Sequence, residues 1–260
     1  MAAPADHPTH GRPGFPGWLS DGFLAPVRVL SPAEAATARR HFNRLEAEVG
    51  IARAEGHLAD RHFDQRFVWD LATSPRVLDA VESLIGADLL LLATRFFCKY
   101  ATAVRGERFV AWHQDATYWG LEPPAAVSAW IAIDASGEEN GCLRVIPGSH
   151  SSGLQPHGRS TRSGNMLTVN QEVASRFFRD EDAVAVPLEA GEMSIHHSLL
   201  LHSSLPNQSD ERRCGLAIRF APPRVRQVRP ATHGALFRPF LVRGRDVHGH
   251  FPLTPAPFPP

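Results

Sequence analysis

Residues 112–120, WHQDATYWG, place a histidine and a carboxylate one residue apart among aromatic side chains. Side chains alternate between the two faces of a β-strand, so His113 and Asp115 point the same way if this stretch is extended. On their own, two such residues most often form a structural pair. They also supply two of the three protein ligands of a site with two histidines and one carboxylate. This metal hypothesis requires a second histidine further along the chain.

The candidates for that histidine lie in residues 195–213, IHHSLLLHSSLPNQSDERR. This segment contains His196, His197 and His202. Because adjacent residues of a strand face opposite sides, at most one of His196 and His197 can point inward. On the residue pattern alone, each of the three histidines is a candidate for the third ligand.

A metal centre of this kind keeps open positions, where a chelating co-substrate and oxygen bind. An anionic co-substrate also needs a buried cation beyond the metal, and the rigid fork of arginine suits a carboxylate better than lysine does. Arg213 lies eleven residues after His202, and the adjacent Arg212 is the alternative. The pattern therefore predicts a metal with a dicarboxylate held beside it.

Four blocks in order, WHQDATYWG, SAWIAID, ENGCLRVIPGSH and HSSLPNQSDERR, resemble the phytanoyl-CoA dioxygenase family of Fe(II)- and 2-oxoglutarate-dependent oxygenases. The match covers about residues 90–225 and is nearest to the small bacterial members. The resemblance implies a double-stranded β-helix (jelly-roll, cupin-like) core with flanking helices. It implies Fe(II), 2-oxoglutarate as co-substrate, and O2. It also favours His202 over the neighbouring histidines, and Arg213 over Arg212.

The resemblance assigns eight residues to the site. The metal ligands that it implies are His113, Asp115 and His202. The co-substrate residues that it implies are Arg213, Ser204, Trp130, Gln114 and Lys99, of which Gln114 and Lys99 are the weaker matches. Related halogenases carry alanine or glycine in place of the carboxylate, so the presence of Asp115 favours oxygenation over halogenation.

The implied reaction oxidises an unactivated C–H bond of a small metabolite or natural-product intermediate and releases succinate and CO2. Hydroxylation, desaturation and ring closure are all open outcomes. One alternative is an acyl-CoA hydroxylase of the same family. The others are a cupin-like metal protein that needs no 2-oxoglutarate and a jelly roll without turnover. Arg213 argues against the last two, because a dicarboxylate co-substrate needs a cation at that position.

The elements that must position these residues can be read from local signals. Helices are predicted over 31–50 and 74–86, each with a serine cap, a proline in the first turn and a final glycine. After Gly86 the chain turns β-prone, in runs at 88–100, 125–134, 141–150, 182–189, 191–204 and 213–222. This order predicts a mostly-β or α+β domain with sheet packed on sheet. The polar segment 151–180 is long enough to be a functional lid.

Composition limits the remaining possibilities. Residues 1–17 are predicted to be flexible, and 18–260 to form a single domain. Lys+Arg and Asp+Glu balance at 27 each, so neither nucleic acid nor a membrane is an expected partner, and a small molecule is the expected substrate. Three widely spaced cysteines and no apolar leader predict a cytoplasmic protein. No oligomeric state is predicted.

Overall fold

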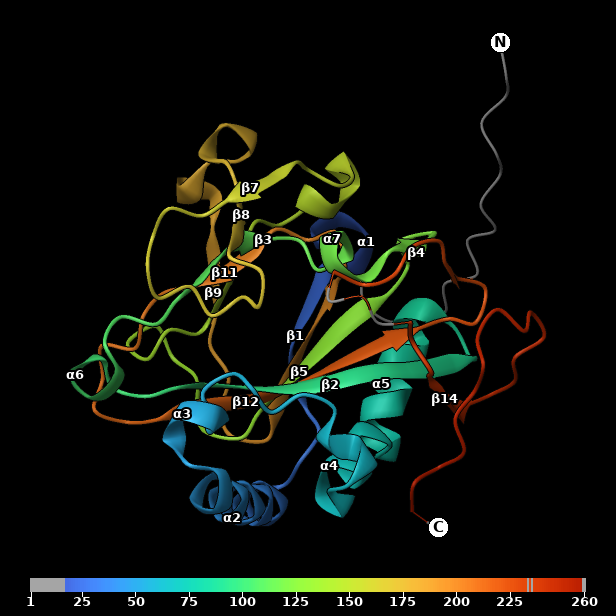
Figure 1. Ribbon diagram of the computed structural model, residues 1–260, viewed down its shortest axis with the longest axis horizontal. Coiled ribbons are helices and arrows are strands. Elements are labelled where there is room, and N and C mark those ends of the chain that lie inside the picture. The colour runs from blue at the N-terminus through green and yellow to red at the C-terminus, as the bar shows by residue number, and fades with distance from the viewer. Residues whose placement is uncertain (1–16, 233, 235, 259–260) are drawn as a thin grey trace.

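A computed structural model describes residues 17–232, 234 and 236–258 (Figure 1). The segment 1–17 that we expected to be flexible lies outside the described residues, except for Gly17, which begins helix α1. The helices are α1 (Gly17–Asp21), α2 (Pro32–Val49), α3 (Ile51–Ala54), α4 (Arg66–Ala72), α5 (Pro75–Ile85), α6 (Thr102–Arg105) and α7 (Ala116–Trp119). Short 3-10 turns lie at Arg61–Phe63, Ser149–Ser152, Ser175–Phe177 and Asp180–Asp182. Among the described helices, none has the length and apolarity needed to cross a membrane.

Two antiparallel sheets form the core. The larger sheet has the order β1 (Phe23–Arg28), β10 (Glu192–His197), β5 (Val127–Ala132), β12 (Arg213–Ala221), β2 (Leu89–Lys99) and β14 (Phe240–Arg243). The smaller sheet has the order β3 (Val110–His113), β11 (His202–Ser204), β6 (Leu143–Val145) and β9 (Val184–Val186). Two further two-stranded antiparallel sheets pair β4 (Leu121–Glu122) with β13 (Arg226–Gln227) and β7 (His157–Arg159) with β8 (Gln171–Val173). Strands far apart in sequence are thus neighbours, which confirms the predicted jelly-roll core.

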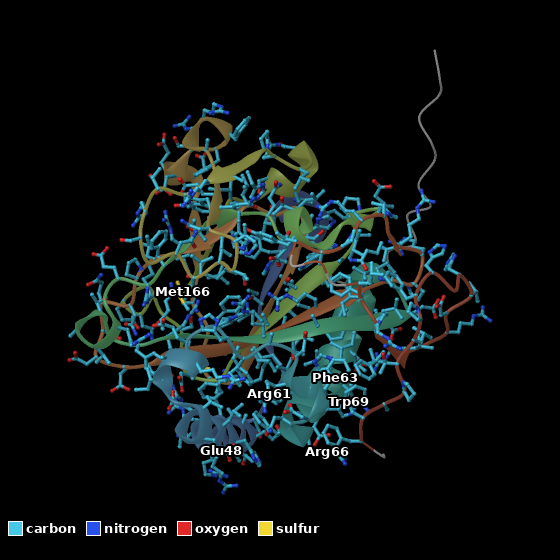
Figure 2. All side chains as sticks on the ribbon, viewed as in Figure 1. Glu48, Arg61, Phe63, Arg66, Trp69 and Met166 are labelled. Atoms are coloured by element: carbon cyan, nitrogen blue, oxygen red, sulfur yellow. The ribbon has the colours of Figure 1, made fainter. Side chains whose placement is uncertain are left out.

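The outer face of the larger sheet is apolar and packs against helices α2, α4 and α5 (Figure 1). Side chains from alternate positions of β2, β5, β10 and β12 contribute to this core. Phe42 of α2 lies at its centre, fully buried, with its ring 4.8 Å from that of Phe96. Phe63 and Trp69, on the same side in Figure 2, pack against Phe240 of β14 at 5.1 and 5.0 Å between ring centroids. The helices therefore cover one face of the sheet and leave the other face to the site.

Both expected helices are present, but only one of them has the predicted serine cap. Ser31 accepts from the backbone N–H of Glu34, and the Glu34 carboxylate accepts from the backbone of Ser31, so the capping box of α2 is present. Ser74 precedes α5, but its side chain makes no capping hydrogen bond. Helix α4 was not predicted, because its N-terminal residue Gln65 offers no capping signal.

Two segments differ from the simplest prediction. The β-prone run 191–204 is not one strand: β10 and β11 belong to different sheets and are separated by residues 198–201. The predicted lid 151–180 contains the β7–β8 pair, and Asn165 within it accepts a hydrogen bond of 3.2 Å from the backbone N–H of Ala111. This segment therefore rests against β3, beside the histidine of the predicted metal site.

Removing the central aromatic ring of the helix-covered core tests this architecture. We expect Phe42→Ala to lower the free energy of unfolding by about 3–5 kcal/mol, because a fully buried ring leaves a cavity. Denaturant unfolding measures the change. Val104→Ala, at a side chain that is 62% exposed, is the matched control and should change stability little. Equal stability of the two variants would contradict the packing described.

Candidate metal centre and co-substrate pocket

Two histidines meet on neighbouring strands of the smaller sheet. His113 ends β3, His202 begins β11, and the two residues are directly opposite in register, with ring centroids 4.0 Å apart. Their Nδ1 atoms lie 2.8 Å from the carbonyl of Ala111 and 2.9 Å from that of Leu200. A carbonyl only accepts, so each Nδ1 carries the proton and each Nε2 is left with its lone pair. Backbone carbonyls thus set both rings in the tautomer that a metal requires.

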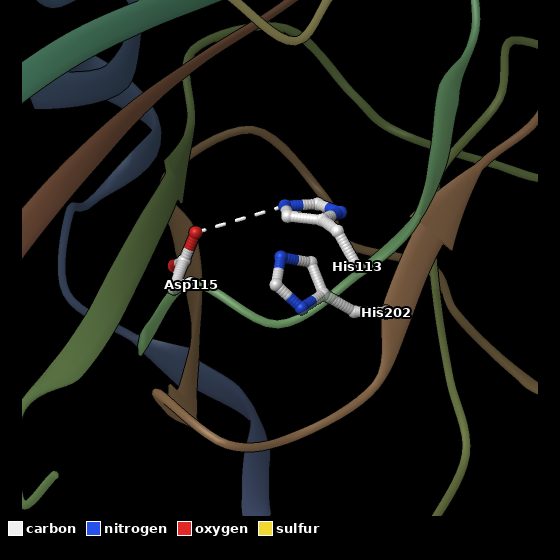
Figure 3. Close-up of side chains that lie close together, drawn as sticks. All are labelled: His113, Asp115 and His202. Carbon is white, nitrogen blue, oxygen red and sulfur yellow. Dashed lines mark ion pairs between the residues drawn. The ribbon is translucent and has the colours of Figure 1, made fainter. Parts of the chain in front are cut away.

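The carboxylate reaches the same point from a turn rather than from a strand. Strand β3 ends at His113, and Asp115 has helical dihedral angles at the start of α7, so the expected strand alternation of 113 and 115 is wrong. The turn nevertheless brings Asp115 Oδ1 to 3.6 Å from His113 Nε2 (Figure 3). Ser128 of β5 donates to Oδ2. One oxygen therefore faces the histidines and the other is fixed by the opposite sheet.

These three residues fit a divalent metal ion. All are buried, and their donor atoms lie within 4.8 Å of one another. First-row metals bind nitrogen and oxygen ligands at about 2.0–2.2 Å, so adjacent ligand atoms of one ion are about 3 Å apart. Burial, and the neighbouring His113 and His196, hold the pKa of His202 well below its usual value, so it is neutral. Burial raises the pKa of Asp115, but His113 and His196 outweigh it and hold that pKa well below the ordinary range.

A third imidazole, which the sequence analysis did not place at the site, lies beside the triad. His196 of β10 points inward, with its ring 4.3 Å from that of His202 and its Nε2 3.5 Å from Asp115 Oδ2. Within the described part of the chain, neither of its ring nitrogens has a hydrogen-bond partner. His197 faces the other way, toward His150 at 5.5 Å between centroids. The alternation expected for the two histidines holds, and knowing the limits of β10 would have identified the inward one.

Arg213 and Arg212 face opposite sides of the larger sheet. Arg213 points inward, stacks over Trp130 with its guanidinium carbon 4.6 Å from the ring centroid, and donates to Ser136. Burial lowers its pKa to about 10, so it stays charged at neutral pH. Among the described residues, no carboxylate forms an ion pair with it. Arg212 points outward and is bound by Asp134 at 2.8 Å, so it is not available to a ligand.

A second buried cation completes the pocket. Lys99 of β2 is directly opposite Arg213 in register and is fully buried. Its ammonium group donates to the hydroxyl of Ser204 and to the carbonyl of Leu205. Burial, and then the charge of Arg213, hold the pKa of Lys99 well below its usual value. Ser204 lies on β11 with His202, so one strand supplies both a ligand of the triad and a contact of this cationic pocket.

Gln114, which the resemblance assigns to the co-substrate, makes its side-chain contacts with loop backbone. Its side-chain amide donates to the carbonyls of Gly153 at 2.9 Å and Leu199 at 2.6 Å. Its amide oxygen accepts from the backbone N–H of Gln155 at 2.7 Å. These contacts connect three loop positions and favour a structural role, and the implied co-substrate contact stays a prediction.

The two aromatic residues that follow Asp115 both contact an apolar cluster, but only one also lies near a histidine of the triad. Trp119 belongs to this cluster with Leu90 and Leu121, and Tyr118 packs against it. The ring of Tyr118 lies 6.1 Å from that of His113, and its hydroxyl is buried without a hydrogen-bond partner among the described residues. Burial, and then the charge of Asp115, raise the pKa of Tyr118. The Tyr118 hydroxyl is therefore the polar group of this turn that could meet a ligand.

A jelly roll that holds two histidines and a carboxylate between its sheets has the donor set of the mononuclear non-haem iron class. The model of the phytanoyl-CoA dioxygenase (PhyH) family matches residues 18–215. The chain therefore belongs to the phytanoyl-CoA dioxygenase family.

Named relatives agree with this assignment. The peroxisomal phytanoyl-CoA dioxygenase of Bos taurus is 25% identical over 222 residues, covering 77% of this chain and 65% of the relative. The ectoine dioxygenase of Nocardia farcinica (strain IFM 10152) is 31% identical over 145 residues, covering 50% and 48%. The first three curated relatives are matched over 65%, 44% and 34% of their own length, so the chain spans less than two thirds of each.

Solved structures share the fold. The apo form of ThoJ, described as a non-heme monooxygenase, has a TM-score of 0.74 and 33% identity, covering 90% of this chain and 85% of its own. The α-ketoglutarate-dependent epimerase SnoN from nogalamycin biosynthesis has a TM-score of 0.64 and 26% identity, covering 80% and 79%.

A close backbone approach under Trp130 gives a test of the pocket. A Cβ atom on Gly215 would lie 1.8 Å from Cζ2 of Trp130, so Gly215→Ala must displace the ring on which Arg213 stacks. We expect 2-oxoglutarate affinity to fall at least about tenfold, which corresponds to about 1.4 kcal/mol. Metal content should not change. Gly158→Ala, where a Cβ meets nothing within 4 Å, is the matched control.

Calorimetric titration of 2-oxoglutarate into the metal-loaded protein measures this effect. An unchanged affinity in folded Gly215→Ala would show that the Trp130 ring does not support the co-substrate pocket.

Proposed function

We propose that this protein is an Fe(II)- and 2-oxoglutarate-dependent oxygenase acting on an unactivated C–H bond of a small metabolite or natural-product intermediate. The observation that carries the proposal is the inward-facing Arg213, a buried cation that forms no ion pair with a described carboxylate. It lies on the same face of the barrel as the triad, together with Lys99 and Ser204. A metal protein without a dicarboxylate co-substrate has no use for such a cation.

His113, Asp115 and His202 would hold the iron, and Arg213 with Ser204 would hold the far carboxylate of 2-oxoglutarate. The bound iron and co-substrate supply the activation of O2 and the oxidation of the substrate C–H bond, with succinate and CO2 as products. Asp115 occupies the position that a halide would need, which supports oxygenation rather than halogenation.

The chain itself orients the reactants and excludes water. The carbonyls of Ala111 and Leu200 keep the proton on Nδ1 of each histidine. Ser128 fixes one oxygen of Asp115, so the carboxylate cannot rotate away. The Trp130 ring shields one side of Arg213, and a guanidinium removed from water binds a carboxylate more strongly. These contacts preorganise the site before a substrate arrives.

Names of relatives support the substrate class. SnoN is described as an α-ketoglutarate-dependent epimerase from nogalamycin biosynthesis, which supports a natural-product intermediate as substrate, and ThoJ is described as a non-heme monooxygenase. An acyl-CoA hydroxylase is the second candidate, because several relatives are named phytanoyl-CoA dioxygenases. The formal net charge of zero gives this alternative no added support. We also propose a cytoplasmic location, which the three free, buried cysteines support.

Anaerobic titration tests the proposed function directly. Fe(II) followed by 2-oxoglutarate should produce the weak visible charge-transfer band of the iron chelate. In Arg213→Gln the band should require at least about tenfold more 2-oxoglutarate, because a charge-assisted bidentate contact is lost. Arg53→Gln, which removes an exposed positive charge on α3, should behave as wild type.

Asp115→Ala should bind far less Fe(II), as determined by metal analysis after desalting. A wild-type protein that binds iron but gives no band at any 2-oxoglutarate concentration would exclude the co-substrate and favour the cupin-like alternative.

A further inference from the structure

A second arginine follows Arg213 on the same face of β12. Side chains at alternate positions of the strand point inward, and Arg219 is the next charged one after Arg213. Arg219 pairs in register with Ser128, the residue that donates to Asp115. Arg213 and Arg219 therefore flank the metal site from different ends of one strand. The pocket that holds the co-substrate carboxylate is at the first end, and Arg219 is at the other.

Arg95 of β2 lies beside Arg219. It pairs in register with Ala217, two residues before Arg219, so the two arginines are diagonal neighbours on one face. Both guanidinium carbons lie near the ring of Phe97, at 4.9 Å for Arg95 and 5.9 Å for Arg219. Burial, and then the charge of Arg219, lower the pKa of Arg95 to about 10. Two positive groups therefore repel each other inside the barrel.

The residues around this arginine pair do not balance its charge. Within the described residues, neither arginine forms an ion pair with a carboxylate. Among the residues that the structure describes, the carbonyl of Ala217, at 3.3 Å, is the one acceptor for Arg219. The acids whose charges act on it are Asp115, which belongs to the triad, and Asp60, which is half exposed.

Binding of iron and 2-oxoglutarate would not neutralise the excess positive charge of the arginine pair. Fe(II) with Asp115, together with Arg213, would balance the two carboxylates of 2-oxoglutarate even without the charge of Lys99. The two positive charges of Arg95 and Arg219 would then face the single negative charge of Asp60. Both arginines are partly buried, and a partly desolvated cation without a counter-ion costs free energy, so an anion is expected here.

We propose that Arg219 and Arg95 form a subsite for an oxyanion of the substrate, a carboxylate or phosphate group. This inference rests on the proposed function, because it defines which substrates that site accepts. Planar guanidinium forks bind both oxyanions through paired hydrogen bonds. Their position on the metal side of β12, away from Lys99 and Arg213, separates this subsite from the co-substrate pocket.

The lid lies over the same subsite. Arg95 donates to the hydroxyl of Thr168, a residue of the segment 151–180, and to the carbonyl of Gly56. Met166 of the same segment, labelled in Figure 2, lies close to Gly56. An oxyanion held by the arginine pair would therefore be enclosed between the larger sheet and the lid. The rest of the substrate would extend toward Tyr118 and the triad.

Calorimetry with inorganic phosphate as the probe tests the subsite without turnover. Phosphate is titrated anaerobically into protein loaded with Fe(II) and saturated with 2-oxoglutarate. We expect saturable binding in wild type, binding weakened at least tenfold in Arg219→Gln, and partial retention in Arg219→Lys. Arg53→Gln controls for the loss of one positive charge. Thermal unfolding of each variant establishes that it is folded. If Arg219→Gln does not fold, the comparison of wild type with Arg219→Lys still tests the subsite.

The affinity for 2-oxoglutarate shows whether the oxyanion at Arg219 belongs to the substrate or to the co-substrate. If the subsite serves the substrate, Arg219→Gln binds 2-oxoglutarate within about threefold of wild type, whereas Arg213→Gln loses at least tenfold. An equal loss in both variants would mean that Arg219 holds the co-substrate, and would overturn the proposal. Equal phosphate affinity in wild type and Arg219→Gln would also overturn it. Failure of the proposed function is a different result, namely no 2-oxoglutarate complex in the wild type.

Discussion

Strand β12 separates its side chains onto two faces, and the positions of both core and site depend on this separation. Leu216, Ile218 and Phe220 point outward into the helix-covered core, where burial of apolar surface contributes about 25 cal/mol per Å². Arg213 and Arg219 point inward, where removing them from water costs free energy. The apolar face stabilises the strand that holds these cations in place. A shift of register by one residue would exchange the two faces and remove both core and site.

Local signals in the sequence were sufficient for the two main helices and the order of the chemical blocks. Helix α2 begins at its capping box, and the spacing of His113 and His202 could be read without any structure. The inward direction of His196 and the loop contacts of the buried Gln114 could not, because both depend on where strands end. Asp115 shows the same limit. Strand alternation predicted that it would lie beside His113, and it does, but it reaches that position from a helical turn and not from a strand.

The triad alone does not select a substrate. Related chains with the same fold are described as a monooxygenase and as an epimerase, so the fold alone does not fix the reaction outcome. In this chain the groups around the triad include the hydroxyl of Tyr118, which has no hydrogen-bond partner among the described residues, the imidazole of His196, and the arginine pair on β2 and β12. Alternation along β12 places Arg213 and Arg219 on the same inward face, and their separation along the strand would let one hold the co-substrate and the other the substrate. This division of charge along one strand explains how a compact interior can distinguish two anionic ligands.

The central claim is that the chain couples O2 to 2-oxoglutarate, and isotope labelling of the product is its most direct test. The Fe(II)-loaded protein is incubated with 2-oxoglutarate under ¹⁸O2, and succinate is collected for mass spectrometry. The account predicts slow formation of succinate carrying one ¹⁸O atom, even before the substrate is identified, and no such product from Asp115→Ala. Iron-loaded wild-type protein that forms no labelled succinate would contradict the account.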